Sequence, residues 1–170
     1  RGAFELKKGG FINLGIGIPT AITNVASEEG ILKNIILNTE SGVIGGAPTP
    51  GLATGASYNP ESMIRQIDMF DLYDGGGIDL AFLRAAEIDR LGNVNVSKYK
   101  GKVTGPGGFI DITQNAKKVC FLASFTAGKM EIQTGDGSLK IISDGTEIKF
   151  VNNVEQITFS GEYARENNKE

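Results

Sequence analysis

Short apolar runs alternate with glycine-rich turns over the first two thirds of the chain. The runs are brief and continuous, as in strands buried on both faces, and lie at Phe11–Leu14, Ile35–Leu37, Ile78–Ala85 and Val119–Leu122. Between the first two runs, Pro19 and Gly30 are typical start and stop signals, which predict a helix over residues 20–30. This order of strand, turn, helix and strand predicts an α/β fold with an open, mostly parallel sheet flanked by helices.

The pattern changes after Met130, where apolar and polar residues alternate with a period of two. Glycine-rich turn signals near residues 135–137 and 144–145 separate the alternating stretches. Alternation of this kind predicts an antiparallel β section toward the C-terminus, with strands near residues 131–133, 139–142 and 148–151.

Two segments between the predicted strands have other compositions. Residues Gly42 to Tyr58 are rich in glycine, alanine, proline and threonine, which predicts a long loop. Loops of this length inside a domain are usually functional. Residues 60–70 predict a short helix, because Met63, Ile67 and their neighbours recur at helical spacing and would form a packing face.

The chain has 170 residues, which suits a single domain over residues 1–170. Lysine and arginine number 17 against 20 acidic residues, so the net charge of −3 argues against nucleic acid as a partner. No apolar run approaches the length of a membrane span, and a cytoplasmic protein is expected. The first residues lack a methionine and a signal-peptide pattern, so the sequence reads as a piece of a longer chain.

The absence of histidine restricts the possible chemistry. Without it, serine–histidine and cysteine–histidine catalysis and most zinc sites are excluded. The single cysteine, Cys120, is flanked by apolar residues and is expected in the core. We therefore expect no metal and no permanently bound cofactor. The 24 glycines are about twice the usual share, and their clusters indicate places where a ligand approaches the backbone.

Glu40 is the sharpest candidate for catalysis. It follows the apolar run Ile35–Leu37 and precedes Ser41 and Gly42. Ligands of open α/β sheets bind beyond the carboxyl ends of the strands, so a carboxylate there can act as a nucleophile or a base. The alternative is an ordinary turn carboxylate on the surface.

Two glycine loops and one asparagine are further candidates. The backbone N–H groups of Gly107 and Gly108 can form an oxyanion hole, although a simple tight turn fits the same residues. Gly15 and Gly17 precede a helix start that can hold an anion, but they complete neither a dinucleotide fingerprint nor a P-loop. Asn93 can supply an amide donor or can simply be a turn residue.

Several of these segments, in this order and spacing, resemble the family I CoA-transferases. They are Asn13–Pro19, Thr39–Val43, Gly75–Asp79, Leu91–Asn95, Gly105–Asp111 and Ile157–Glu162. The similarity is greatest to the β-subunit-like half of fused acetate or propionate CoA-transferases. It implies an absent α-like half, acyl-CoA and short-chain carboxylates as substrates, and a homo-oligomer for the full-length protein.

The resemblance also implies a ping-pong mechanism through a glutamyl-CoA thioester on Glu40. Coenzyme A is then a substrate, and Gly107, Gly108 and Asn93 are the implied oxyanion donors. The resemblance places substrate and CoA contacts at Gly15, Gly17, Ser41, Gly42 and Val43.

Three other interpretations remain open at this point. The same general fold resembles sugar-phosphate isomerases and repressor effector domains, so a non-catalytic phosphate-binding domain is possible. A related acyl-CoA hydrolase shares every residue named above, and an inert structural piece is the third. Glu40 opposite the Gly107–Gly108 loop favours the transferase over a phosphate binder. We expect exposed apolar surface where the missing half docks.

Overall fold

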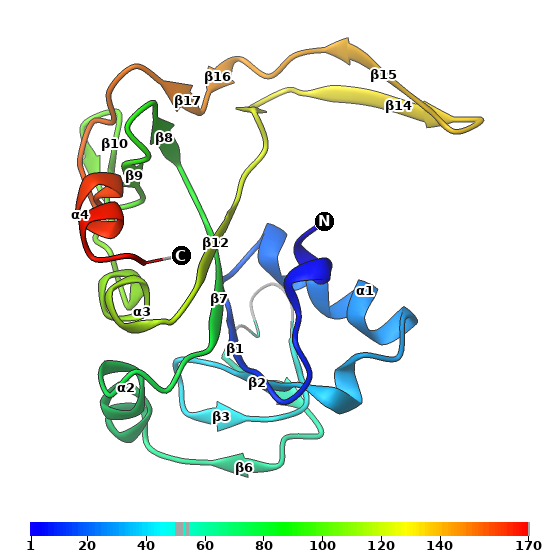
Figure 1. The fold of residues 1–170 in the computed structure, drawn as a ribbon. Helices are drawn as coiled ribbons and strands as arrows, with labels where there is room; N and C mark the ends of the chain where they lie inside the picture. Colours follow the sequence, from blue (N-terminus) through cyan, green and yellow to red (C-terminus); the bar gives the residue numbers. More distant parts are fainter. Residues whose placement is uncertain (50–52, 54, 170) are drawn as a thin grey trace. The chain divides into compact units, whose positions relative to one another are not determined.

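A computed structural model describes residues 1–49, 53 and 55–169 of the chain (Figure 1). These residues form two compact units, which are described separately. The first comprises Arg1–Arg84, Pro106–Leu122 and Ala164–Glu170. The second comprises Ala85–Gly105 and Ala123–Tyr163.

The first unit is built on a six-stranded sheet with the strand order β12-β7-β1-β2-β3-β6. Its strands are β1 Phe11–Leu14, β2 Ile36–Asn38, β3 Val43–Ile44, β6 Ser62–Met63, β7 Leu80–Arg84 and β12 Val119–Leu122. The pairs among β12, β7, β1 and β2 are parallel, and β3 and β6 extend the sheet in antiparallel fashion. The predicted α/β fold with an open, mostly parallel sheet is confirmed.

Helices of the first unit cover both faces of this sheet. They are α1 Ala21–Glu28, α2 Gln66–Asp74 and α3 Phe109–Asn115, with 3-10 turns at η1 Gly2–Glu5, η2 Ile18–Thr20 and η3 Leu32–Asn34. Side chains alternate along β1, so Ile12 and Leu14 join an apolar cluster with Ile22 of α1. Asn13, between them, faces the other way and donates to Tyr73 of α2. Figure 1 shows α2 beside α3 on that second face.

The helix predicted over residues 60–70 is wrong in its first half. Residues 62–63 are extended as β6 and pair with β3, and α2 begins at Gln66. Met63 and Ile67 are 71% and 63% exposed, so these two residues do not belong to a packing face, whereas Phe70 packs against Tyr73. Met69 and Tyr73 are the buried residues of the helix instead. The helical spacing of Met63 was coincidental, because strand pairing with β3 decides its conformation.

The predicted loop from Gly42 to Tyr58 contains more regular structure than expected. It holds β3 and the antiparallel pair β4 Ala47–Pro48 and β5 Ser57–Tyr58. Residues 50–52 and 54 of this loop lie outside the described residues.

The second unit consists of short strands. They are β8 Glu87–Asp89, β9 Val94–Asn95, β10 Lys98–Tyr99, β11 Lys102–Val103, β13 Thr126–Ala127, β14 Glu131–Gly135, β15 Ser138–Ser143, β16 Glu147–Ile148 and β17 Phe150–Val151. The hairpin of β14 and β15 is antiparallel, as predicted. The expectation for residues 148–151 is partly wrong, because β17 pairs in parallel with β8. The last helix is α4 Gly161–Glu166.

The β14–β15 hairpin has one apolar face. Ile132 lies opposite Ile141, and Leu139 follows two residues away on the same side. Every residue of both strands is exposed, and within the described chain these strands pair with each other alone. The hairpin therefore exposes apolar surface, and docking of the missing half on such a surface stays a prediction. The structure holds no described helix with the length and apolar character of a membrane span.

Candidate active site

Glu40 stands just beyond the carboxyl end of β2, in the turn that leads into β3. Backbone hydrogen bonds run from the Gly42 N–H to the Thr39 carbonyl and from the Thr39 N–H to the Val43 carbonyl, both 3.0 Å. Gly42 has a φ of +102°, and a Cβ there would overlap the carbonyl oxygen of Ile64. Glycine is required at this point, so the turn fixes where the half-buried Glu40 side chain begins.

The Glu40 carboxylate packs directly against Gly108, the residue before α3. An ideal Cβ on Gly108 would lie 2.5 Å from Glu40 Oε2, 3.0 Å from Glu40 Cδ and 2.8 Å from Phe70 Cζ. There is no space for any side chain larger than that of glycine unless these atoms move. The structure therefore brings together the two strongest candidates from the sequence, the carboxylate and the glycine loop.

The backbone N–H groups of this loop are available to a ligand. Gly107 is exposed and has a φ of +55°, which glycine adopts without strain. Neither Gly107 nor Gly108 donates its N–H to another residue that the structure describes. Unused amide donors next to a carboxylate are the groups that an oxyanion site requires.

The surroundings of Glu40 disfavour its negative charge. Burial raises the pKa of Glu40 above its usual range, and the nearby Asp111 carboxylate of α3 raises it further. Desolvation and a like charge both favour the protonated form. A carboxyl group perturbed in this way, next to a cavity, is typical of functional sites.

A cavity of about 220 Å³ opens beside Glu40 at the carboxyl edge of β1 and β2. Its wall combines the apolar side chains of Leu14 and Ile16 with the hydroxyl-bearing Thr20 and Thr49. This is the edge at which open α/β sheets bind ligands. The cavity is large enough for a small organic acid and lies below the range of 300–1,000 Å³ found for pockets that enclose drug-sized ligands.

The other residues predicted to contact substrate or CoA shape the local backbone. The Gly15 N–H donates to the Phe82 carbonyl at 2.7 Å, and a Cβ on Gly15 would lie 3.0 Å from the same oxygen. Gly17 turns the chain into η2 with a φ of +94°. The Ser41 hydroxyl donates to the Gly55 carbonyl. Ser41 and Gly55 line the cavity, and Gly15 and Gly17 flank its lining residue Ile16. Ligand binding by Gly15, Gly17 and Ser41 stays a prediction.

Val43 and Cys120 are packed side chains. Val43 is buried in β3, where it lies opposite Met63. Cys120 is half-buried in β12 and packs against the cluster that contains Ile12 and Phe82. In the residues covered by the structure, no group of three or more metal-ligating side chains occurs.

Asn93 belongs to the second unit, in the turn between β8 and β9. Its Nδ2 donates to Asp89 Oδ2 at 3.0 Å, and its Oδ1 accepts the Gly161 N–H at 3.0 Å. Burial acts to raise the pKa of Asp89, but hydrogen bonds from Asn93 and Leu91 hold it below its usual range. The amide thus has a structural function, and its use as an oxyanion donor stays a prediction.

Reasoning from the sequence missed a buried polar cluster next to Glu40. Asn13 and Asn38 lie opposite each other on β1 and β2, and both contact the Tyr73 hydroxyl. The signal was present, because Asn13 interrupts the apolar run Phe11–Leu14 and Asn38 directly follows the run Ile35–Leu37. Parallel pairing makes such residues neighbours.

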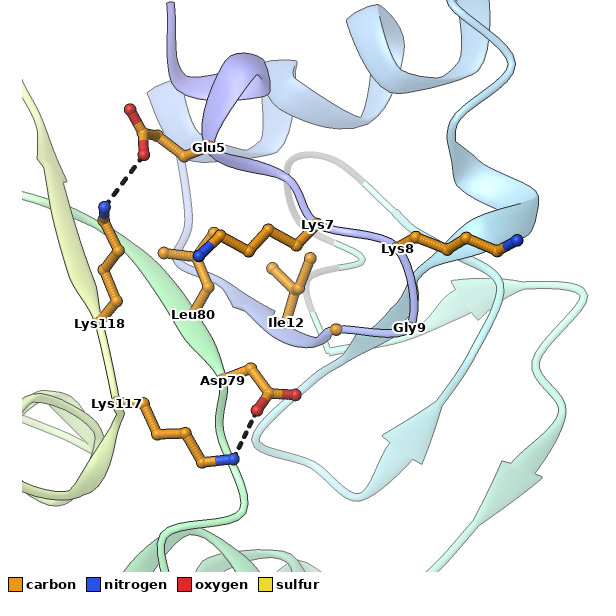
Figure 2. Close-up of a pocket in the computed structure, with 10 residues that line it drawn as sticks. Glu5, Lys7, Lys8, Gly9, Ile12, Asp79, Leu80, Lys117 and Lys118 are labelled. Atoms are coloured by element: carbon orange, nitrogen blue, oxygen red, sulfur yellow. Dashed lines mark hydrogen bonds and ion pairs between the residues drawn. The ribbon is translucent and has the colours of Figure 1, made fainter.

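A second cavity, of about 410 Å³, lies at the amino ends of the strands (Figure 2). Its sides carry the ion pairs Lys117 Nζ–Asp79 Oδ1 at 2.7 Å and Lys118 Nζ–Glu5 Oε2 at 3.1 Å. Because the central strands are parallel, this cavity lies at their amino ends and Glu40 lies at their carboxyl ends. It is therefore separate from the candidate active site.

Comparison with known proteins agrees with this arrangement. No family model matches the chain. It is 49% identical over 175 residues to caffeate CoA-transferase of Acetobacterium woodii, in an alignment that covers 100% of this chain and 33% of that protein. It is also 30% identical to the B subunit of the succinyl-CoA:3-ketoacid coenzyme A transferase of Helicobacter pylori, over 92% of this chain and 85% of that relative. The chain belongs to the family I CoA-transferases.

Solved structures show the same similarity. The acyl-CoA transferase YdiF of Escherichia coli superimposes with a TM-score of 0.89 at 42% identity, over 98% of this chain and 31% of that one. A second YdiF structure, with a TM-score of 0.89 and 41% identity over 99% of this chain and 32% of that one, is a thioester complex with CoA. Glutaconate coenzyme A-transferase of Acidaminococcus fermentans shares the fold, with a TM-score of 0.65 at 18% identity over 92% of this chain and 57% of that one.

The chain spans about a third of the length of caffeate CoA-transferase and of YdiF, but most of the length of the Helicobacter pylori relative. It therefore corresponds to the β-subunit-like half of the family.

Proposed function

We propose that the protein containing this chain is an acyl-CoA:carboxylate CoA-transferase in which Glu40 is the nucleophile. The observation that carries the proposal is the contact between the Glu40 carboxylate and Gly108, next to unused backbone donors and a small cavity. Membership of the CoA-transferase family and the similarity to YdiF support it.

In the first half-reaction, a Glu40 carboxylate oxygen attacks the thioester carbonyl carbon of the acyl-CoA. The carbon–sulfur bond breaks, the CoA thiolate leaves, and Glu40 holds the acyl group as a mixed anhydride. The thiolate then attacks the Glu40 carbonyl carbon and expels the acyl group as a free carboxylate. Glu40 is left as a thioester of CoA, and no proton has been transferred.

The second half-reaction runs these steps in reverse with a different acid. The carboxylate of the incoming acid attacks the glutamyl thioester, and the thiolate leaves. The thiolate then attacks the acyl carbonyl of the new anhydride, and the Glu40 carboxylate is released. The chemistry needs no histidine, in agreement with a chain that has none.

Each attack generates an oxyanion that needs donors. The Gly107 and Gly108 N–H groups are the proposed donors for it, and Asn93 is the proposed amide donor. Loss of one such donor typically raises the barrier by about 3–4 kcal/mol. The raised pKa of Glu40 contributes as well, because a poorly solvated carboxylate is a stronger nucleophile than one surrounded by water.

The cavity beside Glu40 supports a short-chain acid as the acyl group. We propose that the CoA portion follows the edge formed by Gly15, Gly17 and the turn at Ser41–Val43. An α-like half of the enzyme would complete the site, and the full-length protein would be a cytoplasmic homo-oligomer. Residues 1–170 would serve in it as a single β-subunit-like domain.

The test is the intact mass of the full-length protein after incubation with acetyl-CoA or propionyl-CoA. The expected product is an adduct with the mass of CoA minus water, absent in Glu40→Gln and present in the control Glu28→Gln on the exposed side of α1. Discharge of the adduct by a second acid to new acyl-CoA identifies a transferase, and discharge by water alone identifies a hydrolase. Failure of the wild-type protein to form any adduct while CoA still binds would overturn the proposal.

A further inference from the structure

A polar cluster is buried beneath the Glu40 turn. Asn13, Asn38 and Tyr73 are each at most 1% exposed. The Tyr73 hydroxyl donates to Asn38 Oδ1 at 2.6 Å, and Asn13 Nδ2 donates to Asn38 Oδ1 at 3.3 Å and to the Tyr73 hydroxyl oxygen at 3.2 Å. Apolar residues could fill this space without the free-energy cost of removing two amides and a hydroxyl from water.

The cluster is also incompletely paired. Asn13 Oδ1 and Asn38 Nδ2 are buried and have no partner among the residues that the structure describes. An unpaired buried polar atom destabilises a fold by about 1–3 kcal/mol, so a cluster of this kind calls for a function other than stability.

One side of the cluster leads to Glu40. Asn38 is the last residue of β2, two positions before Glu40. Burial raises the pKa of Tyr73, and the negative charge of Glu40 raises it further, so hydroxyl and carboxylate are electrostatic neighbours. The hydrogen bond from the Tyr73 hydroxyl to Asn38 thus holds the strand end from which Glu40 projects.

The other side of the same helix leads to the glycine loop. Phe70 lies one turn before Tyr73 on α2, and its Cζ lies 2.8 Å from the place of a Cβ on Gly108. The two rings meet edge to face, with centroids 5.4 Å apart and an interplanar angle of 65°. This pair of aromatic residues thus contacts both the end of β2, two residues before Glu40, and the glycine loop at Gly108.

We propose that Tyr73 and Phe70 of α2 are positioning residues that set the distance between the Glu40 carboxylate and the Gly107–Gly108 amides. This inference rests on the proposed function. Reacting atoms must approach to about 3–3.5 Å with correct alignment, and errors of about 1 Å lower rates by as much as 10²-fold. Tyr73 acts through its hydrogen bond to Asn38, and Phe70 acts through its packing against Gly108.

Tyr73→Phe is the direct test, because it removes one hydroxyl and keeps the ring that meets Phe70. In the full-length protein we expect the rate of CoA-adduct formation, and kcat, to fall by about 10-fold or more. The KM for acyl-CoA should change by less than about 2-fold, because CoA contacts are untouched. Tyr58→Phe is the matched control, since the Tyr58 side chain is 65% exposed and should leave kcat unchanged.

A second variant separates positioning from stability. Met69→Leu alters a fully buried side chain of the same helix that takes part in none of the hydrogen bonds of the polar cluster. If Met69→Leu lowers Tm as much as Tyr73→Phe does, the Met69→Leu protein should still keep the wild-type kcat. Equal losses of kcat in the two variants, or a wild-type rate in Tyr73→Phe, would overturn the inference. If wild-type protein forms no adduct, the proposed function fails instead, so the two failures are distinguishable.

Discussion

The contact between Glu40 and Gly108 makes Gly108→Ala a sensitive perturbation. Gly108 has a φ of −74° and a ψ of 2°, which alanine adopts without strain, so the added methyl group is the whole change. That methyl carbon would lie 2.5 Å from Glu40 Oε2, whereas ordinary contacts begin at 3.4 Å. The carboxylate must therefore move by about 0.9 Å, and Phe70 Cζ, at 2.8 Å, by about 0.6 Å.

These displacements predict a large effect on rate and a small one on stability. A carboxylate at the end of a flexible side chain can rotate away, so overpacking should destabilise the protein by about 1 kcal/mol, the low end of such substitutions. A nucleophile misplaced by almost 1 Å loses about 10²-fold in rate. Rapid mixing with acyl-CoA, acid quenching and intact mass measure the rate of adduct formation, and thermal unfolding measures stability.

Gly135→Ala in β14 is the matched control, because a Cβ there meets nothing within 4 Å and no positive φ opposes it. It should react at the wild-type rate. A Gly108→Ala protein that forms the adduct as fast as the wild type would refute the idea that Glu40 reacts from its position against Gly108.

Three further predictions concern charge and donors. Burial, and to a smaller extent Asp111, raise the pKa of Glu40 in the folded state, so ionisation of Glu40 destabilises the fold as pH rises above the ordinary carboxyl range. Glu40→Gln should therefore raise Tm at pH 7 relative to wild type. In unfolding scans the difference in Tm should shrink toward pH 4. Asp111→Asn removes the like charge, so the pKa of Glu40 should fall and the acidic limb of the pH–rate profile should move to lower pH. Asn93→Ala should slow adduct formation by about 10²–10³-fold if the amide serves the oxyanion. It should also destabilise the protein by about 1–3 kcal/mol, because Asp89 and Gly161 lose their partner; loss of stability with an unchanged rate, measured well below Tm, would contradict the donor role.

The central sheet was predictable because its signals are local. The runs at Phe11–Leu14 and Val119–Leu122 are strands within the predicted bounds, and Pro19 and Gly30 bracket the first helix. A strand of a parallel sheet is buried on both faces, so it appears in the sequence as a continuous apolar run between turn signals, whichever strands it pairs with.

The errors occur where distant residues decide the conformation. Met63 is extended because it pairs with Val43, and Phe150 joins Ile88 in parallel pairing across a long stretch of sequence. No local pattern of residues specifies such partners. Composition likewise suggested one loop where β3, β4 and β5 form short pairs.

The candidate site shows the same division. Glu40 at a strand end and the glycines near residue 108 were each visible in the sequence, but their contact needed the fold. Tyr73 was missed, because its importance follows from the pairing of Asn13 with Asn38 and from the face of α2 that turns toward them.

The strand order has a consequence for how the protein comes to be made. The central strand β1 receives one neighbour early, when Phe11 pairs with Ile36, but its other neighbour comes much later, when Ile12 pairs with Leu80. During synthesis, the edge of β1 therefore stays open while the ribosome adds the residues up to β7, and Gly108 follows later still. Non-local parallel pairing is slow, and an open apolar edge is prone to aggregation. We expect the nascent chain to depend on chaperones at this stage, and Glu40 to be in place before the glycine loop at Gly107 and Gly108 exists.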